Sequence, residues 1–172
     1  MTIVPDTKDW TWVLNRRCPE CGFDAGSVAP TDVAGRVRAA SSRWVKVLGG
    51  SASAQRPAPA VWSPLEYACH VRDVLRLYDE RLALMLTQPD PPYDNWDQDA
   101  AAEAGRYGEQ DPDQVAGEIA PAAEQIAARF DEMAAEHWSR TGRRSDGAAF
   151  TVVSFARYFL HDVEHHLHDV RG

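Results

Sequence analysis

The sequence predicts an all-α protein, a four-helix bundle with a long crossover between its second and third helices and an irregular N-terminal arm. Four segments repeat apolar residues at helical spacing and begin with helix-capping residues. No segment shows the alternation of apolar and polar residues that marks a long strand. The long connection between the second and third segments indicates that the bundle is not wired in simple up-and-down order.

Capping residues set the expected helix boundaries. Ser63 is followed by a proline at the first helical position and by Glu66 three residues after the cap, which is the pattern of a capping box. Asp111, also followed by a proline, predicts the start of the third helix, and Pro121 predicts a kink within it. The predicted helices cover approximately residues 31–48, 63–87, 111–140 and 151–170.

The segments outside these helices have distinct compositions. Prolines at positions 89, 91 and 92 open the crossover, in which we expect a short helix within residues 96–107, and a polar loop is expected at 141–147. The first thirty residues have no helical periodicity but contain Trp10 and Trp12, and disordered tails are seldom this rich in tryptophan. We therefore expect residues 1–30 to form an arm packed on one bundle domain, residues 31–172.

The composition is that of an ordinary globular domain. Of the 172 residues, 44% are hydrophobic and 26% are charged, which suits one domain with its own core. The formal net charge of -8, without a cluster of Lys and Arg, argues against nucleic-acid binding. The first residues include Asp6, Lys8 and Asp9 and no apolar run, so we do not expect them to act as a secretory signal. No apolar stretch approaches the ~20 residues of a membrane span, and three cysteines are too few for a disulfide framework. We expect a cytoplasmic protein, monomeric or homodimeric, with a small-molecule substrate.

Four of the six histidines fall in the last predicted helix. At 100° per residue, Asp162 and His166 lie on the edge of that helix's apolar stripe. They are four residues apart, so their side chains lie on the same face of the helix and can bind one ion. His161, His165 and His168 are expected to point away from the stripe and therefore from the core.

His70 lies at the margin of the apolar stripe of the second helix. Alone it would be interpreted as a hydrogen-bonded core histidine. With Asp162 and His166 it gives two imidazoles and one carboxylate on one side of a divalent metal ion, with other coordination positions open. Zinc is the preferred ion, and nickel, iron and manganese are alternatives. A different helical register would instead use His161 and His165, which are also four residues apart.

Two short motifs resemble one known family. Residues 62–70 read Trp-Ser-Pro-Leu-Glu-Tyr-Ala-Cys-His, similar to the start of the second helix in DinB-like proteins, where the first metal histidine stands eight residues after a tryptophan. The pair His165-His166 followed by Asp169-Val170 is similar to the last helix of that family. These motifs are short, but the order of the predicted elements agrees with the DinB-like bundles from residue 31 to residue 170.

The last helix also resembles that of the mycothiol-dependent maleylpyruvate isomerases. The spacing of Asp162, His166 and Asp169 matches their metal pair and the acid that follows it, although those enzymes carry Glu where this chain has the shorter Asp162. The resemblance implies transfer or isomerisation with a low-molecular-weight thiol such as mycothiol, or hydrolysis by a metal-activated water. The alternative is a non-catalytic, metal-stabilised binding module. Four acids are candidates to orient the imidazoles: Glu66, Asp73, Glu164 and Asp169.

Cys18 and Cys21 have the spacing of one half of a zinc ribbon. A structural zinc ion needs four ligands, and the chain has no second Cys-x-x-Cys pair. Cys69 or a histidine such as His137 could complete a site only if the fold happened to bring it close. We therefore expect a tight turn with two unligated thiols.

Overall fold

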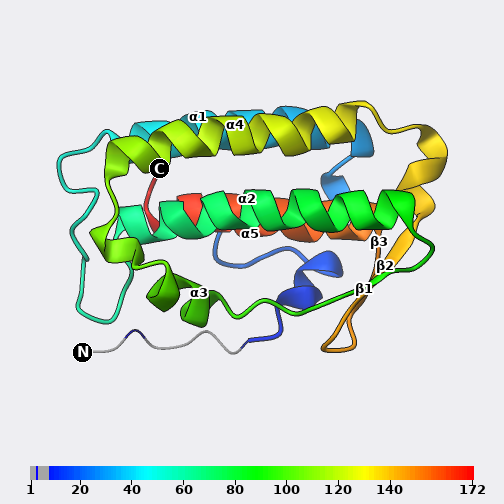
Figure 1. Ribbon diagram of the computed structural model, residues 1–172, viewed down its shortest axis with the longest axis horizontal. Coiled ribbons are helices and arrows are strands. Elements are labelled where there is room, and N and C mark those ends of the chain that lie inside the picture. The colour runs from blue at the N-terminus through cyan, green and yellow to red at the C-terminus, as the bar shows by residue number, and fades with distance from the viewer. Residues whose placement is uncertain (1–2, 4–7) are drawn as a thin grey trace.

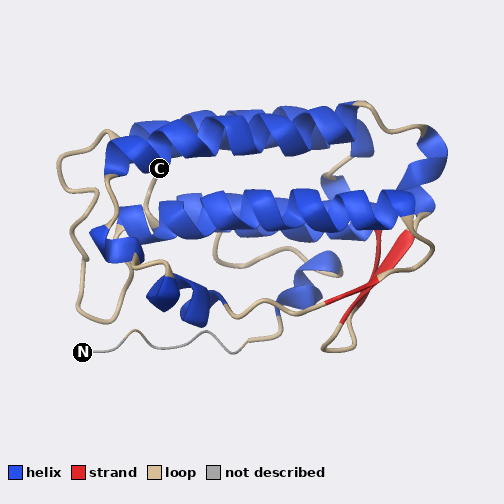
Figure 2. Ribbon diagram, viewed as in Figure 1, coloured by secondary structure: helices blue, strands red, loops and turns tan. Residues whose placement is uncertain are grey.

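A computed structural model describes Ile3 and residues 8–172 and confirms the all-α architecture (Figures 1 and 2). Helices α1 and α2 both pack on α4 and α5 and have little contact with each other, so they lie on a diagonal of the bundle. This is the non-sequential wiring expected from the long crossover. The bundle helices are α1 (Val33–Leu48), α2 (Pro64–Thr87), α4 (Pro112–Asp131) and α5 (Val152–Asp169).

The crossover returns the chain along the length of the bundle. The colours in Figure 1 show that α2 and α4 run in the same direction, so the chain must travel back between them. On this path it forms β1 (Pro92–Tyr93), α3 (Gln98–Ala104) and the short 3-10 helix η4 (Tyr107–Glu109). The crossover therefore covers one side of the bundle, below α2 and α5 in Figure 1.

The region between α4 and α5 differs from the prediction. Helix α4 remains helical past Pro121 but ends at Asp131, and the 3-10 helix η5 (Ala135–Ser139) follows it. Instead of a loop, the next residues form an antiparallel hairpin of β2 (Thr141–Arg144) and β3 (Ala149–Thr151), with β1 parallel to β2. Strands of two to four residues are too short to produce a recognisable alternation in the sequence.

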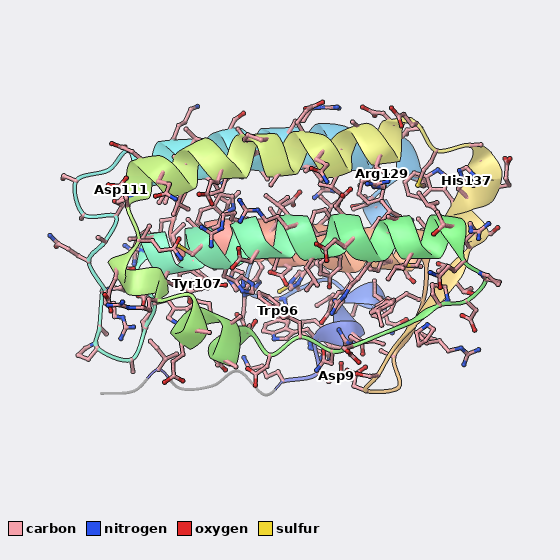
Figure 3. All side chains as sticks on the ribbon, in the orientation of Figure 1. Asp9, Trp96, Tyr107, Asp111, Arg129 and His137 are labelled. Atoms are coloured by element: carbon pink, nitrogen blue, oxygen red, sulfur yellow. The ribbon has the colours of Figure 1, made fainter. Side chains whose placement is uncertain are left out.

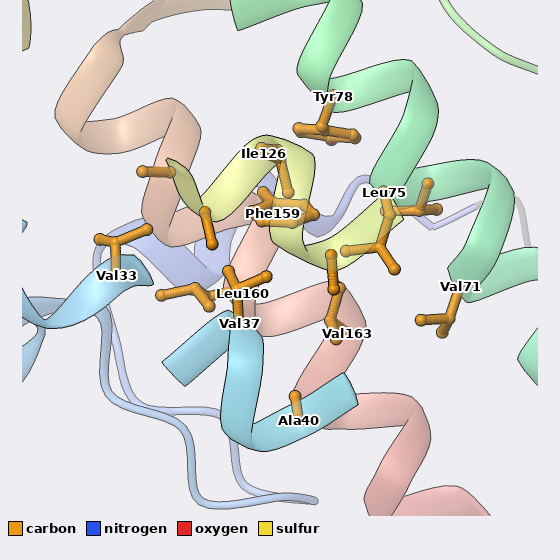
Figure 4. Packing of buried hydrophobic residues seen from close by; sticks show 14 of the residues in the cluster. Val33, Val37, Ala40, Val71, Leu75, Tyr78, Ile126, Phe159, Leu160 and Val163 are labelled. Carbon is orange, nitrogen blue, oxygen red and sulfur yellow. The ribbon is translucent and has the colours of Figure 1, made fainter. Parts of the chain in front are cut away.

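The core lies between the four helices and extends under the arm. Figure 4 shows Val37 of α1 close to Leu160 of α5, and Ile126 of α4 close to Phe159 of α5. The arm adds buried residues of its own, among them Cys18, Phe23 and Val28. Its short 3-10 helices are η1 (Trp10–Leu14), η2 (Ala25–Ser27) and η3 (Pro30–Asp32).

The described part of the arm contacts α5 directly. The guanidinium of Arg157 on α5 donates to the carbonyl of Val28, at 2.9 Å from Nη2. Both η1 and η2 also lie against α5. Residues 1–2 and 4–7 of the predicted arm lie outside the described residues. Within the described part of the chain, no helix is long and apolar enough to cross a membrane.

The capping box at the start of α2 is present. Ser63 Oγ accepts from the backbone N–H of Glu66 at 3.2 Å, and the Ser63 N–H donates to Glu66 Oε2 at 2.8 Å. Because Ser63→Ala removes the acceptor for one helix-end N–H, we expect it to lower the free energy of unfolding by about 1 kcal/mol. Urea denaturation measures this loss.

The matched control for this prediction is Ser42→Ala. Ser42 is exposed in the interior of α1, where its hydroxyl only bonds the carbonyl of Arg38 one turn earlier. That substitution should change the stability by less than about 0.5 kcal/mol. Equal losses of unfolding free energy in the two variants would show that the capping hydrogen bond of Ser63 does not stabilise the protein.

Candidate metal centre

His70, Asp162 and His166 meet between α2 and α5 and are called the α2–α5 cluster. His70 Nε2 lies 3.0 Å from Asp162 Oδ1, and His166 Nε2 lies 3.4 Å from the same oxygen. One ligand atom from each of the three residues lies within 4.8 Å of the others. The i, i+4 spacing on α5 projects two of these side chains toward the single histidine of α2. The fold thus brings together the three residues singled out in the sequence.

The carboxyl group of Asp162 is held in its ionised form. Burial raises the pKa of this group, but attraction to His70, the hydrogen bond with His70 and attraction to His166 outweigh burial and lower the pKa to about 2. Asp162 is therefore an anion at neutral pH. Metal ions bind carboxyl groups in this form.

Asp169 orients the ring of His166. Its Oδ2 lies 2.8 Å from His166 Nδ1, so Nδ1 carries the proton of this hydrogen bond and Nε2 is left to face Asp162. Metal-binding histidines are commonly oriented by a carboxylate in this way. The other three acids expected in this role have different partners: Glu66 pairs with Arg56, Asp73 accepts from Tyr107, and Glu164 pairs with Arg36.

Aromatic rings enclose His70. The indole of Trp96, in the crossover, stacks on the imidazole with ring centroids 5.4 Å apart, and Trp62 packs against it at 5.6 Å. Figure 3 shows Trp96 just below α2. The histidine is 1% exposed, and its Nδ1 has no hydrogen-bond partner within the described part of the chain. These contacts fix the ring so that Nε2 is directed at Asp162.

The α2–α5 cluster borders a cavity of about 300 Å³. Trp62 and Tyr67 line it at the start of α2, and Lys8 and Trp10 line it from the arm. A second hollow of about 490 Å³, lined partly by arginines, reaches Asp162 as well. The side chain of Asp162 is 25% exposed, so solvent reaches this member of the cluster.

A second group of ligand-type residues lies beside the first. This arm–α5 cluster consists of Cys18, Cys21, His161 and His165, and one ligand atom from each lies within 4.8 Å of the others. His161 and His165, expected from the sequence to point away from the core, are nevertheless buried, because the arm covers them and leaves them 4% and 5% exposed. The arm also brings its two thiols next to these histidines.

The other residues considered as partners for these thiols lie elsewhere. Cys69 is buried on α2, where its sulfur lies 3.4 Å from Gln110 Oε1. His137 lies in η5, and its Nδ1 accepts from the backbone N–H of Ala134. Neither is part of a group of potential metal ligands among the described residues.

Burial controls protonation in the arm–α5 cluster. It lowers the pKa of His161 to about 4, helped by repulsion from His165, and it lowers the pKa of His165 as well. Both imidazoles are therefore neutral at neutral pH, the form that binds metal ions. Burial also raises the pKa of the Cys21 thiol to about 11. Without a cation this thiol keeps its proton, whereas a coordinated thiol loses it.

Comparison with known proteins identifies the family. The family model described as the DinB superfamily matches residues 34–170, which is most of the chain. The chain belongs to the DinB superfamily. None of the curated proteins matches the sequence.

A solved structure with the same bundle extends this comparison. YfiT from Bacillus subtilis, described as a probable metal-dependent hydrolase with an unusual four-helix bundle topology, aligns with a TM-score of 0.72. The alignment covers 83% of this chain and 86% of the YfiT chain, at 16% sequence identity. At that identity, the similarity shows that the two proteins share the DinB fold.

The last helix of this DinB-superfamily chain carries two ligand pairs on neighbouring faces. Asp162 and His166 turn toward α2, whereas His161 and His165, the alternative register, turn toward the arm. The two registers therefore correspond to two separate clusters and do not compete for one site. His168 is exposed and belongs to neither cluster.

Proposed function

We propose that this protein is a metal-dependent enzyme whose α2–α5 cluster holds one divalent ion, with zinc as the preferred ion. The observation that supports this most is that three ligand groups converge and that two of them, Asp162 and His166, line a cavity. Two imidazoles and one carboxylate leave at least one coordination position for a small molecule, as in catalytic zinc sites. The similarity to a probable metal-dependent hydrolase agrees with this proposal.

The spacing of the ligand atoms suits a metal ion. Two ligands bound at 2.0–2.1 Å in a tetrahedral arrangement lie about 3.3 Å from each other. Asp162 Oδ1 lies 3.0 Å from His70 Nε2 and 3.4 Å from His166 Nε2. These two distances suit ligands of one ion, and an ion bound there would replace the contact between Asp162 and His70.

The residues around the cluster have separable roles. An ion bound there supplies Lewis acidity, which lowers the pKa of a coordinated thiol or water toward neutrality. Asp169 holds the His166 ring in its binding tautomer, and the rings of Trp62 and Trp96 shield His70 from solvent. A cavity of about 300 Å³ admits a small substrate and excludes a folded polypeptide.

Between the two candidate nucleophiles, we propose a low-molecular-weight thiol first and water second. A thiolate is a soft ligand that suits zinc, and coordination activates it without a dedicated general base. The cavity has aromatic walls and also contains the cationic side chain of Lys8, features suited to a small thiol with polar groups. In the alternative, a non-catalytic metal-stabilised module, the ion would only link α2 to α5 and stabilise the fold, and no small molecule would bind to it.

Cobalt substitution tests the proposal. Adding small thiols to the cobalt-loaded protein should produce a difference spectrum with thiolate-to-metal charge-transfer absorption. The response should saturate, and His70→Ala should abolish it because that variant loses one ligand of the α2–α5 cluster. Difference spectra are needed because they cancel any absorption from thiolates of the protein itself.

The outcomes separate the two nucleophiles from the alternative. A site that gives no thiol response, but whose visible spectrum changes when azide is added, is open and favours activated water. A site whose spectrum responds to neither ligand is closed, and that result would contradict the enzymatic proposal. Loss of the folded state on metal removal, without any ligand response, would indicate the metal-stabilised module.

A further inference from the structure

We propose that the arm–α5 cluster binds a structural zinc ion that fastens the N-terminal arm to α5. This site is distinct from the α2–α5 cluster and does not depend on the function proposed for it. Two cysteines and two histidines provide the complete tetrahedral set of a structural zinc site. The α2–α5 cluster, by contrast, provides three ligands and leaves a coordination position open toward the cavity that residues of both clusters line.

The backbone reverses in a tight, hydrogen-bonded turn around the two cysteines. The Gly22 N–H donates to the Cys18 carbonyl at 3.0 Å, and the Cys18 N–H donates to the Phe23 carbonyl at 2.8 Å. Gly22 has φ +78°, a conformation that favours glycine and lets the chain reverse directly after Cys21. The turn therefore directs both sulfur atoms toward α5.

The histidines complete the site from the helix. His161 and His165 are one turn apart, so their rings project from the same face of α5. Cys18 Sγ lies 3.7 Å from His165 Nδ1. A sulfur and a nitrogen bound to one tetrahedral zinc ion at 2.3 Å and 2.0–2.1 Å lie about 3.6 Å apart, so the observed spacing fits.

One buried nitrogen lacks a partner unless a cation is bound. Nε2 of His161 is inaccessible to solvent and has no hydrogen-bond partner in the part of the chain described by the structure. An unpartnered buried polar atom destabilises the fold. Coordination to zinc would remove this cost, and the two cysteines would bind as thiolates, releasing two protons to solvent.

Nε2 of His165 faces the carboxylates of Glu20 and Asp169. It lies 3.4 Å from Glu20 Oε2 and 3.7 Å from Asp169 Oδ1. These carboxylates favour a proton on Nε2 and leave Nδ1 free to bind metal beside Cys18. Asp169 also accepts from His166 of the α2–α5 cluster, so the two sites share one orienting residue.

The zinc ion would also hold one wall of the cavity in place. The ring of Trp10 packs on His165 with centroids 5.1 Å apart and on His161 at 5.5 Å, and Trp10 lines the cavity at the α2–α5 cluster. Loss of zinc from the arm–α5 cluster should therefore weaken the binding of small ligands at the other cluster without emptying it. Gln98 and Asp99 of the crossover line the same cavity as Trp10.

Zinc content and X-ray absorption spectroscopy test the inference on the full chain. The wild-type protein should carry about two zinc ions, and Cys18→Ser should carry about one. In His70→Ala, which lacks a ligand of the other cluster, the remaining zinc should show two sulfur neighbours at about 2.3 Å and two nitrogen neighbours at about 2.0–2.1 Å. This second measurement keeps all four proposed ligands intact, so it remains decisive if the cysteine variant does not fold.

Cys69→Ala is the matched control, because Cys69 is buried but lies outside both clusters. It should retain two zinc ions and the sulfur neighbours. Zinc without sulfur neighbours in His70→Ala, or Cys18 and Cys21 reacting as free thiols in the zinc-loaded wild type, would overturn the inference. A wild type with only one zinc ion, bound by two sulfurs, would support this site and contradict the α2–α5 site instead.

Discussion

Replacing His70 with alanine is expected to reduce the zinc affinity of the α2–α5 cluster by at least about 100-fold. Loss of a residue that merely orients a metal ligand costs 10–100-fold in affinity, so loss of a ligand should cost at least the upper end of that range. His70 is the only residue of α2 in this cluster, and the side chains packed against its ring, Trp62 and Trp96, cannot bind a metal ion in its place. Elemental analysis after dialysis against a weak chelator measures the loss.

His166→Ala should have the same effect, and His168→Ala provides the control. The side chain of His168 is 54% exposed and lies outside both clusters, although it is on the same helix. Its loss should leave the metal content unchanged. If both His70→Ala and His166→Ala retain the full metal content, the α2–α5 cluster is not a metal site.

Asp162→Ala and His161→Ala are expected to empty different sites, although the two residues are adjacent in the chain. Consecutive helical residues diverge by about 100°, which directs Asp162 toward His70 and His161 toward the arm. In the cobalt protein, Asp162→Ala should retain the absorption of the cysteine-bound ion and lose the response to added thiols. His161→Ala should lose or alter the cysteine absorption and keep some response to thiols.

The conservative variant Asp162→Asn controls for folding, since it keeps the size of the side chain but makes it a poor metal ligand. It should behave as Asp162→Ala does in the cobalt experiment. The opposite pattern, in which His161→Ala removes the thiol response and Asp162→Ala preserves it, would mean that the ligands of the open site were assigned in the wrong register.

The main features of the fold could be predicted from the sequence because they are encoded locally. The capping box at Ser63 and the apolar stripes lie within single helices. The long crossover follows from the number of residues between the end of the second helix and the N-cap of the next bundle helix. The hairpin between α4 and α5 could not be predicted, because its strands are short and its pairing joins residues outside any periodic segment. Tertiary contacts decide such pairings.

The same distinction applies to the sites. The helical phase placed Asp162 and His166 on the edge of the apolar stripe of the last helix, and the structure brings them to His70. The phase also directed His161 and His165 away from the helical core, but it carried no information on what covers them. An irregular arm has no periodicity, so its path across α5 could not be inferred. The signal in the sequence is the number of ligands, since the Cys-x-x-Cys pair and the i, i+4 histidine pair together provide four.

The most direct test of the open metal site is an anomalous difference map from crystals of the zinc-loaded protein. We expect a peak bonded to His70 Nε2, His166 Nε2 and one oxygen of Asp162 at about 2.0–2.2 Å, with a non-protein ligand on the side of the cavity. Absence of a peak between these residues, or a fourth protein ligand closing the ion off from the cavity, would contradict the account.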